Sequence, residues 1–91
     1  MAQVLCEISE GLRPAEATVK LVDYYGRTYF LPADREWLTK IGDRYYMPVI
    51  LIHIDEAHKA ALVELPIETD SGAHRLWFKL EHLYQPNETK R

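Results

Sequence analysis

The middle of the chain, from Tyr45 to Ile54, is apolar at nearly every position. The run is rich in β-branched and aromatic residues, and turn-forming pairs flank it, Gly42-Asp43 before it and Asp55-Glu56 after it. A run of this composition, bounded in this way, predicts one long β-strand rather than a helix. Pro48 predicts a bend or bulge within that strand, because proline cannot donate to the hydrogen-bond ladder.

Further strands are predicted on both sides of this run. Residues 59–66 and 74–80 follow it after short polar turns, which predicts an antiparallel meander. Three earlier segments have β-strand character, namely 3–9, 17–23 and 28–31, and Pro32 is expected to end the third. A loop at 10–16 separates the first two. Residues 33–40 are expected to form a short helix or turn that lays Trp37 and Leu38 over one end of the sheet.

Alternation along the strands gives each one two faces. One consistent assignment places the following side chains in the core: Ile50, Ile52, Ile54, Ala61, Val63, Leu65, Leu76, Phe78 and Leu80. The opposite face then holds Met47, Val49, Leu51, Leu62 and Trp77. That face is too apolar to stay bare on a monomer. Either the amino-terminal strands fold over it, as in a closed barrel or sandwich, or a partner covers it.

Length and charge limit the organisation and the partners. A chain of 91 residues is expected to form one domain, here residues 1–84, followed by a polar, flexible tail at 85–91. The net charge of −3 gives no broad basic surface of the kind that duplex DNA binding requires. Residues 1–8 lack the pattern of a signal peptide, and no apolar run is long enough to span a membrane, so we expect a cytoplasmic protein. Cys6, the single cysteine, is expected to be a small buried residue rather than a reactive thiol.

No histidine pair has the spacing of a dedicated zinc site. The four histidines are His53, His58, His74 and His82, and the pair to inspect first for a metal is His53 with His58. We expect hairpin-end and surface histidines, no metal and no cofactor.

Two groups of residues have catalytic types without catalytic context. Asp70, Ser71 and His74 are neighbours in a turn, and a triad is defined by geometry rather than by proximity in sequence. The carboxylates Asp55 and Glu56 lie in a hairpin loop, where solvated turn residues are expected. We therefore expect no enzyme activity.

The aromatic residues give the best indication of function. Tyrosine and tryptophan combine a large contact area with a polar group and are enriched at binding hot spots. The candidate partner-binding residues are Tyr24, Tyr25, Trp37, Tyr45, Arg75, Trp77 and Lys79. The alternation of Arg75, Trp77 and Lys79 suits stacking on a nucleic-acid base or a proline-rich peptide, and it also suits a tryptophan that covers the barrel while its charged neighbours reach water.

At the level of fold, the chain resembles small SH3-like barrels. The features that carry the resemblance are the order of short strands, the loop after the first strand and a closing helical turn at 81–84; the segment Leu21-Val22-Asp23-Tyr24-Tyr25 is similar to the Ala-Leu-Tyr-Asp-Tyr motif of eukaryotic SH3 domains. The resemblance implies a mainly β protein, either an SH3-like barrel or a two-layer antiparallel sheet of five to six strands with one short helical segment. It implies no ligand site.

Three functions follow as hypotheses. The favoured one is a non-catalytic module whose aromatic surface binds a protein, a peptide or a second copy of the chain. The first alternative is a small nucleic-acid-binding barrel that uses Arg75, Trp77 and Lys79. The second alternative is an enzyme or metal-binding accessory protein of unknown type.

Overall fold

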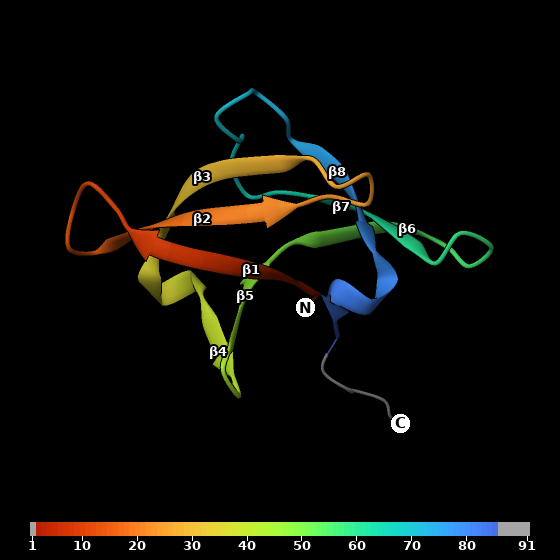
Figure 1. Ribbon diagram of the computed structural model, residues 1–91, viewed down its shortest axis with the longest axis horizontal. Coiled ribbons are helices and arrows are strands. Elements are labelled where there is room, and N and C mark those ends of the chain that lie inside the picture. The colour runs from red at the N-terminus through yellow and green to blue at the C-terminus, as the bar shows by residue number, and fades with distance from the viewer. Residues whose placement is uncertain (1, 86–91) are drawn as a thin grey trace.

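The strands form two antiparallel sheets in the computed structural model, which describes residues 2–85 (Figure 1). The larger sheet has six strands in the order β3-β2-β1-β5-β4, with β9 beside β1. They are β1 (Gln3–Glu10), β2 (Glu16–Val22), β3 (Thr28–Asp34), β4 (Thr39–Ile41), β5 (Arg44–Pro48) and β9 (Leu83–Tyr84). The smaller sheet contains β6 (Ile50–Asp55), β7 (Ala60–Glu64) and β8 (Arg75–Lys79). The predicted mainly β, antiparallel class and the meander in the second half are confirmed.

Two single turns of 3-10 helix complete the described part, η1 (Arg35–Trp37) and η2 (Leu80–His82). The carboxylate of Asp34 caps η1 by accepting from the Glu36 N–H at 2.9 Å. After η1, Leu38 packs against the core, while Trp37 stays 39 % exposed. The helical segment predicted at 33–40 is therefore present as one short turn, and η2 supplies the closing turn before β9.

The predicted long strand is divided at Val49, because its two halves belong to different sheets. β5 pairs with β1 up to Pro48, and β6 pairs with β7 from Ile50 onward (Figure 1). Val49 itself is buried, and its N–H donates to the carbonyl of Ala2 at 3.0 Å. The bend predicted at Pro48 is thus a crossover between the two layers, and the expectation of one continuous strand is corrected.

A β-bulge in β6 overturns part of the predicted core. Leu51 lies opposite Val63 and Ile54 lies opposite Ala61, with a register shift between Leu51 and His53 that leaves Ile52 as the extra residue. The side chains of Leu51 and Ile54 therefore share the inner face although they are three positions apart. Ile50 and Ile52, expected in the core, are 62 % and 40 % exposed.

The core lies between the two sheets and draws on both. It contains Val4, Cys6, Val19, Leu21, Leu31 and Ala33 from the larger sheet, Met47 and Val49 from the crossover, and Val63, Leu65, Leu76 and Phe78 from the second half. The predicted core positions in β7 and β8 are confirmed, as is the burial of Cys6. Leu80 is only half-buried, because it lies in η2 beyond the end of β8. Met47 and Val49, expected on the opposite face, are core residues that the amino-terminal strands cover.

Strand β3 continues through Pro32 to Asp34, so Pro32 does not end it as predicted. β3 is an edge strand, and the backbone of Phe30 faces away from β2: its carbonyl accepts from Asp70 N at 2.7 Å, and its N–H donates to Asp70 Oδ1 at 3.1 Å. Pro32, two residues on, has the same orientation and needs no N–H there. The Asp70 contact also ties the β7–β8 loop to the larger sheet.

No helix within residues 2–85 has both the length and the apolar character needed to cross a membrane. The predicted tail at 85–91 lies, from residue 86 onward, outside the described residues.

Candidate binding surface

The structure distributes the predicted aromatic and cationic residues over four places. Arg75, Trp77 and Lys79 lie on β8, and the other candidates come from the larger-sheet half of the domain. Trp37 lies in η1 near one end of the smaller sheet, and Tyr24 and Tyr25 lie in the β2–β3 turn near the other end. Tyr45 is separate, because it lies on β5 in the larger sheet.

The side of the smaller sheet that points away from the core consists of three cross-strand rows, which we call the outer face. These rows are Ile50, Glu64 and Arg75; His53, Leu62 and Trp77; and Asp55, Ala60 and Lys79. The exposed Ile52 lies in the bulge beside the middle row. The outer face therefore presents aliphatic and aromatic side chains at its centre and charged groups toward its ends.

Trp77 is held at the centre of the outer face. It is half-buried, lies directly opposite Leu62 on β7, and meets the His53 ring edge-on with centroids 6.3 Å apart. These neighbours restrict the indole ring, so Trp77 would lose little side-chain entropy on contact with a ligand.

The charges at the two ends of the outer face differ in their partners. Arg75 donates to one carboxylate oxygen of Glu64, from Nη2 at 3.1 Å and from Nε at 3.2 Å. Lys79, at the other end, forms no ion pair with any residue from 2 to 85. The Arg75 end is thus electrically compensated, and the Lys79 end keeps a free positive charge.

An apolar groove extends the outer face beyond Ile50. It has a volume of about 270 Å³ and is lined by Trp37, Pro48, Val49, Ile50, Pro66 and Glu64. Glu64 is its single ionisable group, and Arg75 already binds that carboxylate. The groove can therefore accept an apolar side chain but offers no group for proton transfer.

The β2–β3 turn is fixed beside the other end of the outer face. The Tyr24 N–H donates to the carbonyl of Trp77 at 2.7 Å, and the Tyr24 hydroxyl donates to the carbonyl of His58 at 3.1 Å. Tyr25 packs edge-on against Tyr24 and remains mostly exposed, with the Arg27 guanidinium 5.1 Å from its ring centre. Tyr24 therefore belongs to the rim of the outer face, and Tyr25 lies behind it.

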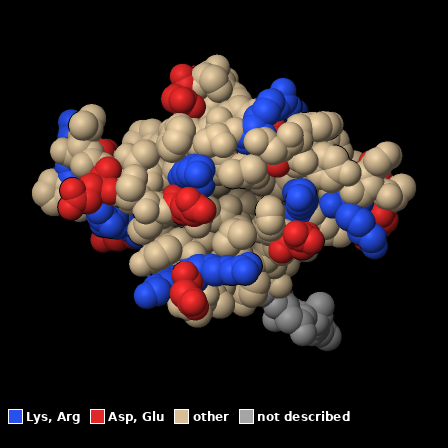
Figure 2. All heavy atoms as spheres, in the orientation of Figure 1, with Lys and Arg blue, Asp and Glu red and all other residues tan. Residues whose placement is uncertain are grey.

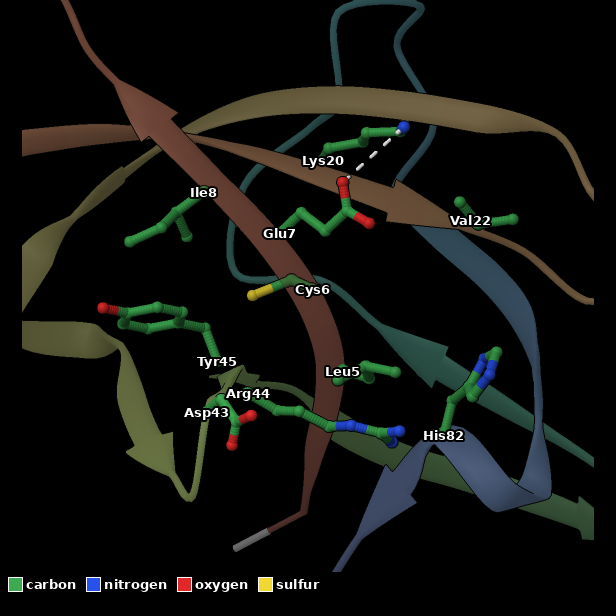
Figure 3. Close-up of a pocket in the computed structure, with 10 residues that line it drawn as sticks. All are labelled: Leu5, Cys6, Glu7, Ile8, Lys20, Val22, Asp43, Arg44, Tyr45 and His82. Atoms are coloured by element: carbon green, nitrogen blue, oxygen red, sulfur yellow. Dashed lines mark ion pairs between the residues drawn. The ribbon is translucent and has the colours of Figure 1, made fainter.

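Tyr45 lines a different hollow, of about 740 Å³, on the larger sheet. Figure 3 shows Cys6, Ile8 and Tyr45 on one side of β1, and Val22 and His82 on the other. Burial, and secondarily the Glu7 carboxylate, raise the pKa of the Cys6 thiol to about 12. The thiol is therefore protonated at neutral pH and has no nucleophilic character there.

The catalytic and metal candidates are engaged in local structure. Ser71 Oγ lies 3.2 Å from Thr69 Oγ1 within the turn, rather than in a contact with His74. His58 Nδ1 lies 2.8 Å from Asp55 Oδ2, and this hydrogen bond lowers the pKa of the Asp55 carboxyl. His53 packs on Trp77 instead of joining His58. Within residues 2–85 no three histidine, cysteine or acidic residues lie together in a way that suits a metal ion.

The sequence did not reveal Ile50, Pro48 and Pro66 as surface residues. The alternation of the run placed Ile50 in the core, and only the bulge and the crossover reverse that assignment. The only feature of the sequence that indicated these surface positions was the pair of prolines themselves: Pro48 precedes the crossover at Val49, and Pro66 follows β7.

Comparison with protein-family models, with curated proteins and with solved structures finds no match to this chain. What the domain does is therefore inferred from its own residues.

Proposed function

We propose that this domain is a non-catalytic interaction module, built as an SH3-like barrel, that binds a segment of another protein across its outer face. The observation that carries the proposal is the continuity of the outer face with the apolar groove. Ile50 and Trp37 are exposed there, and the row that contains Ile50 is the neighbour of the row that contains the fixed indole of Trp77. Exposed apolar side chains that adjoin a rigid tryptophan are typical of interface hot spots.

Three features of the chain support the barrel part of the proposal. A loop at 11–15 follows β1, the central run bends at Pro48 and contributes to both sheets, and the turn η2 leads into a last strand that pairs with β1. The loop and the closing turn are among the features on which the resemblance to SH3-like barrels was based, and the exchange between sheets adds to them. Aromatic-lined surfaces on such small barrels suit extended segments of a partner.

The nucleic-acid alternative uses the same β8 residues and has weaker support. Arg75 is occupied by Glu64, and the indole of Trp77 is half-buried rather than free to stack. On the face drawn in Figure 2, basic and acidic side chains are interleaved instead of forming a basic stripe. Affinity for single-stranded DNA or RNA that falls steeply with salt would favour this alternative.

The proposed function is tested by a pull-down from the native host with three variants of the immobilised domain. Ile50→Asp and Trp37→Ala alter the apolar end of the outer face, where both residues are already exposed. We expect each to reduce partner recovery about tenfold or more, because a hot-spot contact is lost. Quantitative mass spectrometry measures the recovery, and circular dichroism verifies the fold of each variant.

The matched control is Val22→Asp. Val22 is also a β-branched, partly exposed strand residue, but it lies on β2 beside the hollow that Tyr45 lines. This control is expected to retain the partners. If folded Ile50→Asp and Trp37→Ala recover the same proteins as the wild type, the outer face is not the binding surface.

A further inference from the structure

The positive end of the outer face continues into a hollow that the β2–β3 turn closes. This hollow, of about 670 Å³, is lined by Tyr24, His58, Lys59, Lys79, Leu80 and Glu81. The hydrogen bond from the Tyr24 hydroxyl to the His58 carbonyl holds the Tyr24 ring as part of the wall. The hollow is thus a defined feature at the Lys79 end of the outer face, beside the row that contains Trp77.

Two lysines dominate the charge of this hollow. Lys79 has no ion-pair partner in the described range, and Lys59 has only a long contact of 3.8 Å between its Nζ and Glu56 Oε1. Glu81 is the one acidic residue of the lining, and its Oε2 lies 3.8 Å from the imidazole Nε2 of His82. A carboxylate that enters the hollow would therefore meet a free ammonium group.

We infer that the partner of the outer face is an acidic protein segment, which places an apolar side chain on Trp77 and a carboxylate on Lys79. The inference rests on the proposed function. Trp77 and Lys79 lie two residues apart on one face of β8, a separation of about 7 Å. An extended partner repeats the same spacing between its own residues i and i+2. The preferred motif is an apolar residue and an aspartate or glutamate separated by one residue, with the acidic residue second in a segment parallel to β8 and first in an antiparallel one.

The compensated Arg75 end decides on which side of Trp77 the carboxylate of the partner lies. A carboxylate placed two residues toward Arg75 would meet a guanidinium that Glu64 already holds. The outer face of a second copy offers no better match, because its two carboxylates, Glu64 and Asp55, bind Arg75 and His58. Charge complementarity therefore favours an acidic segment of a different protein.

The inference is tested with a library of random nine-residue peptides displayed on phage and selected against the immobilised full chain. We expect enrichment of peptides in which an apolar and an acidic residue are separated by one residue, in one consistent order. The most enriched peptide is then synthesised with its acidic residue and with the corresponding amide, and its affinity is measured for the wild type and for Lys79→Gln. The amide in the peptide and Lys79→Gln in the domain should each weaken binding about fivefold. The amide peptide should bind Lys79→Gln no more weakly than this, because both changes remove the same ion pair.

Lys40→Gln is the matched control, since Lys40 is an exposed strand lysine of the larger sheet. It should bind the acidic peptide as the wild type does. Peptides that need Ile50 and Trp37 but show no acidic preference, or that bind Lys79→Gln unchanged, would overturn this inference and leave the proposed function standing. Tight, salt-sensitive binding of a single-stranded oligonucleotide at Lys79 would also overturn it. Failure to select any peptide would contradict both.

Discussion

Asp23 shows how one buried charge determines the position of an aromatic residue at the rim of the outer face. Its side chain is buried and accepts four hydrogen bonds, from the N–H groups of Tyr25 and Arg27 at 2.9 Å each, from Arg27 Nε at 3.2 Å and from the Tyr29 hydroxyl at 3.0 Å. Burial, and then the hydrogen bond to Asp23, raise the pKa of the Tyr29 phenol, so Tyr29 stays a donor at neutral pH. This network shapes the turn that carries Tyr24.

We expect Asp23→Ala to lower the free energy of unfolding by about 3 kcal/mol, because four donors lose a charged acceptor in a poorly hydrated site. Urea denaturation followed by circular dichroism measures the change. The control is Asp43→Ala, an exposed acid in the turn before β5, which should change stability by less than about 0.5 kcal/mol. Equal effects of the two substitutions would mean that the network contributes nothing beyond an ordinary surface turn.

Cys6 is expected to resist alkylation in the folded protein. Burial raises the pKa of its thiol to about 12, against 9.0 for a free thiol. At pH 8 the fraction of molecules that carry a thiolate therefore falls from about one in ten to about one in ten thousand. Iodoacetamide should therefore label the protein slowly in buffer and rapidly in concentrated urea, as measured by mass spectrometry. Rapid labelling without urea would show that the thiol is exposed or activated.

At the scale of elements, the crossover at Val49 and the bulge at Ile52 decide which side chains of the central run reach the core. Without the bulge, strict alternation would put Ile50, Ile52 and Ile54 on one face. With it, Leu51 and Ile54 face inward, and Ile50 becomes part of the outer face. The composition of the outer face thus depends on one extra residue in one strand.

This register is tested by a pair of alanine substitutions in β6. Leu51→Ala should cost about 2–3 kcal/mol, because Leu51 packs against the core, and Ile52→Ala less than about 1 kcal/mol, because its side chain is partly exposed. Thermal or urea unfolding of the two variants under the same conditions gives the comparison. A larger loss of stability for Ile52→Ala than for Leu51→Ala would indicate simple alternation along β6 and would contradict the bulge.

At the scale of the whole molecule, the two sheets share one core and are joined by backbone hydrogen bonds at two places. Tyr24 N donates to the Trp77 carbonyl, and Asp70 N donates to the Phe30 carbonyl, both at 2.7 Å. Neither sheet has a second core of its own among the described residues. The domain should therefore unfold as one cooperative unit.

The two tryptophans report on different parts of the domain and can test this cooperativity. In Trp37→Phe the fluorescence comes from Trp77 in the middle of the smaller sheet, and in Trp77→Phe it comes from Trp37 in η1, beside the crossover between the sheets. Within each variant, we expect the fluorescence and far-ultraviolet circular dichroism transitions in urea to coincide. A fluorescence transition that precedes the loss of circular dichroism in either variant would indicate that one sheet opens separately.

The sequence alone determined the class of fold, since the alternation in β1, β2, β7 and β8 and the turns between strands are local properties. It also predicted the burial of Cys6 and the alternation that places Arg75, Trp77 and Lys79 on one face of β8. The tertiary structure alone decided that β5 and β6 belong to different sheets, that β3 continues through Pro32 at an open edge, and that Ile50 lies outside. The reason is physical: strand character depends on neighbouring residues, whereas the face that a side chain occupies depends on bulges and pairing partners far along the chain.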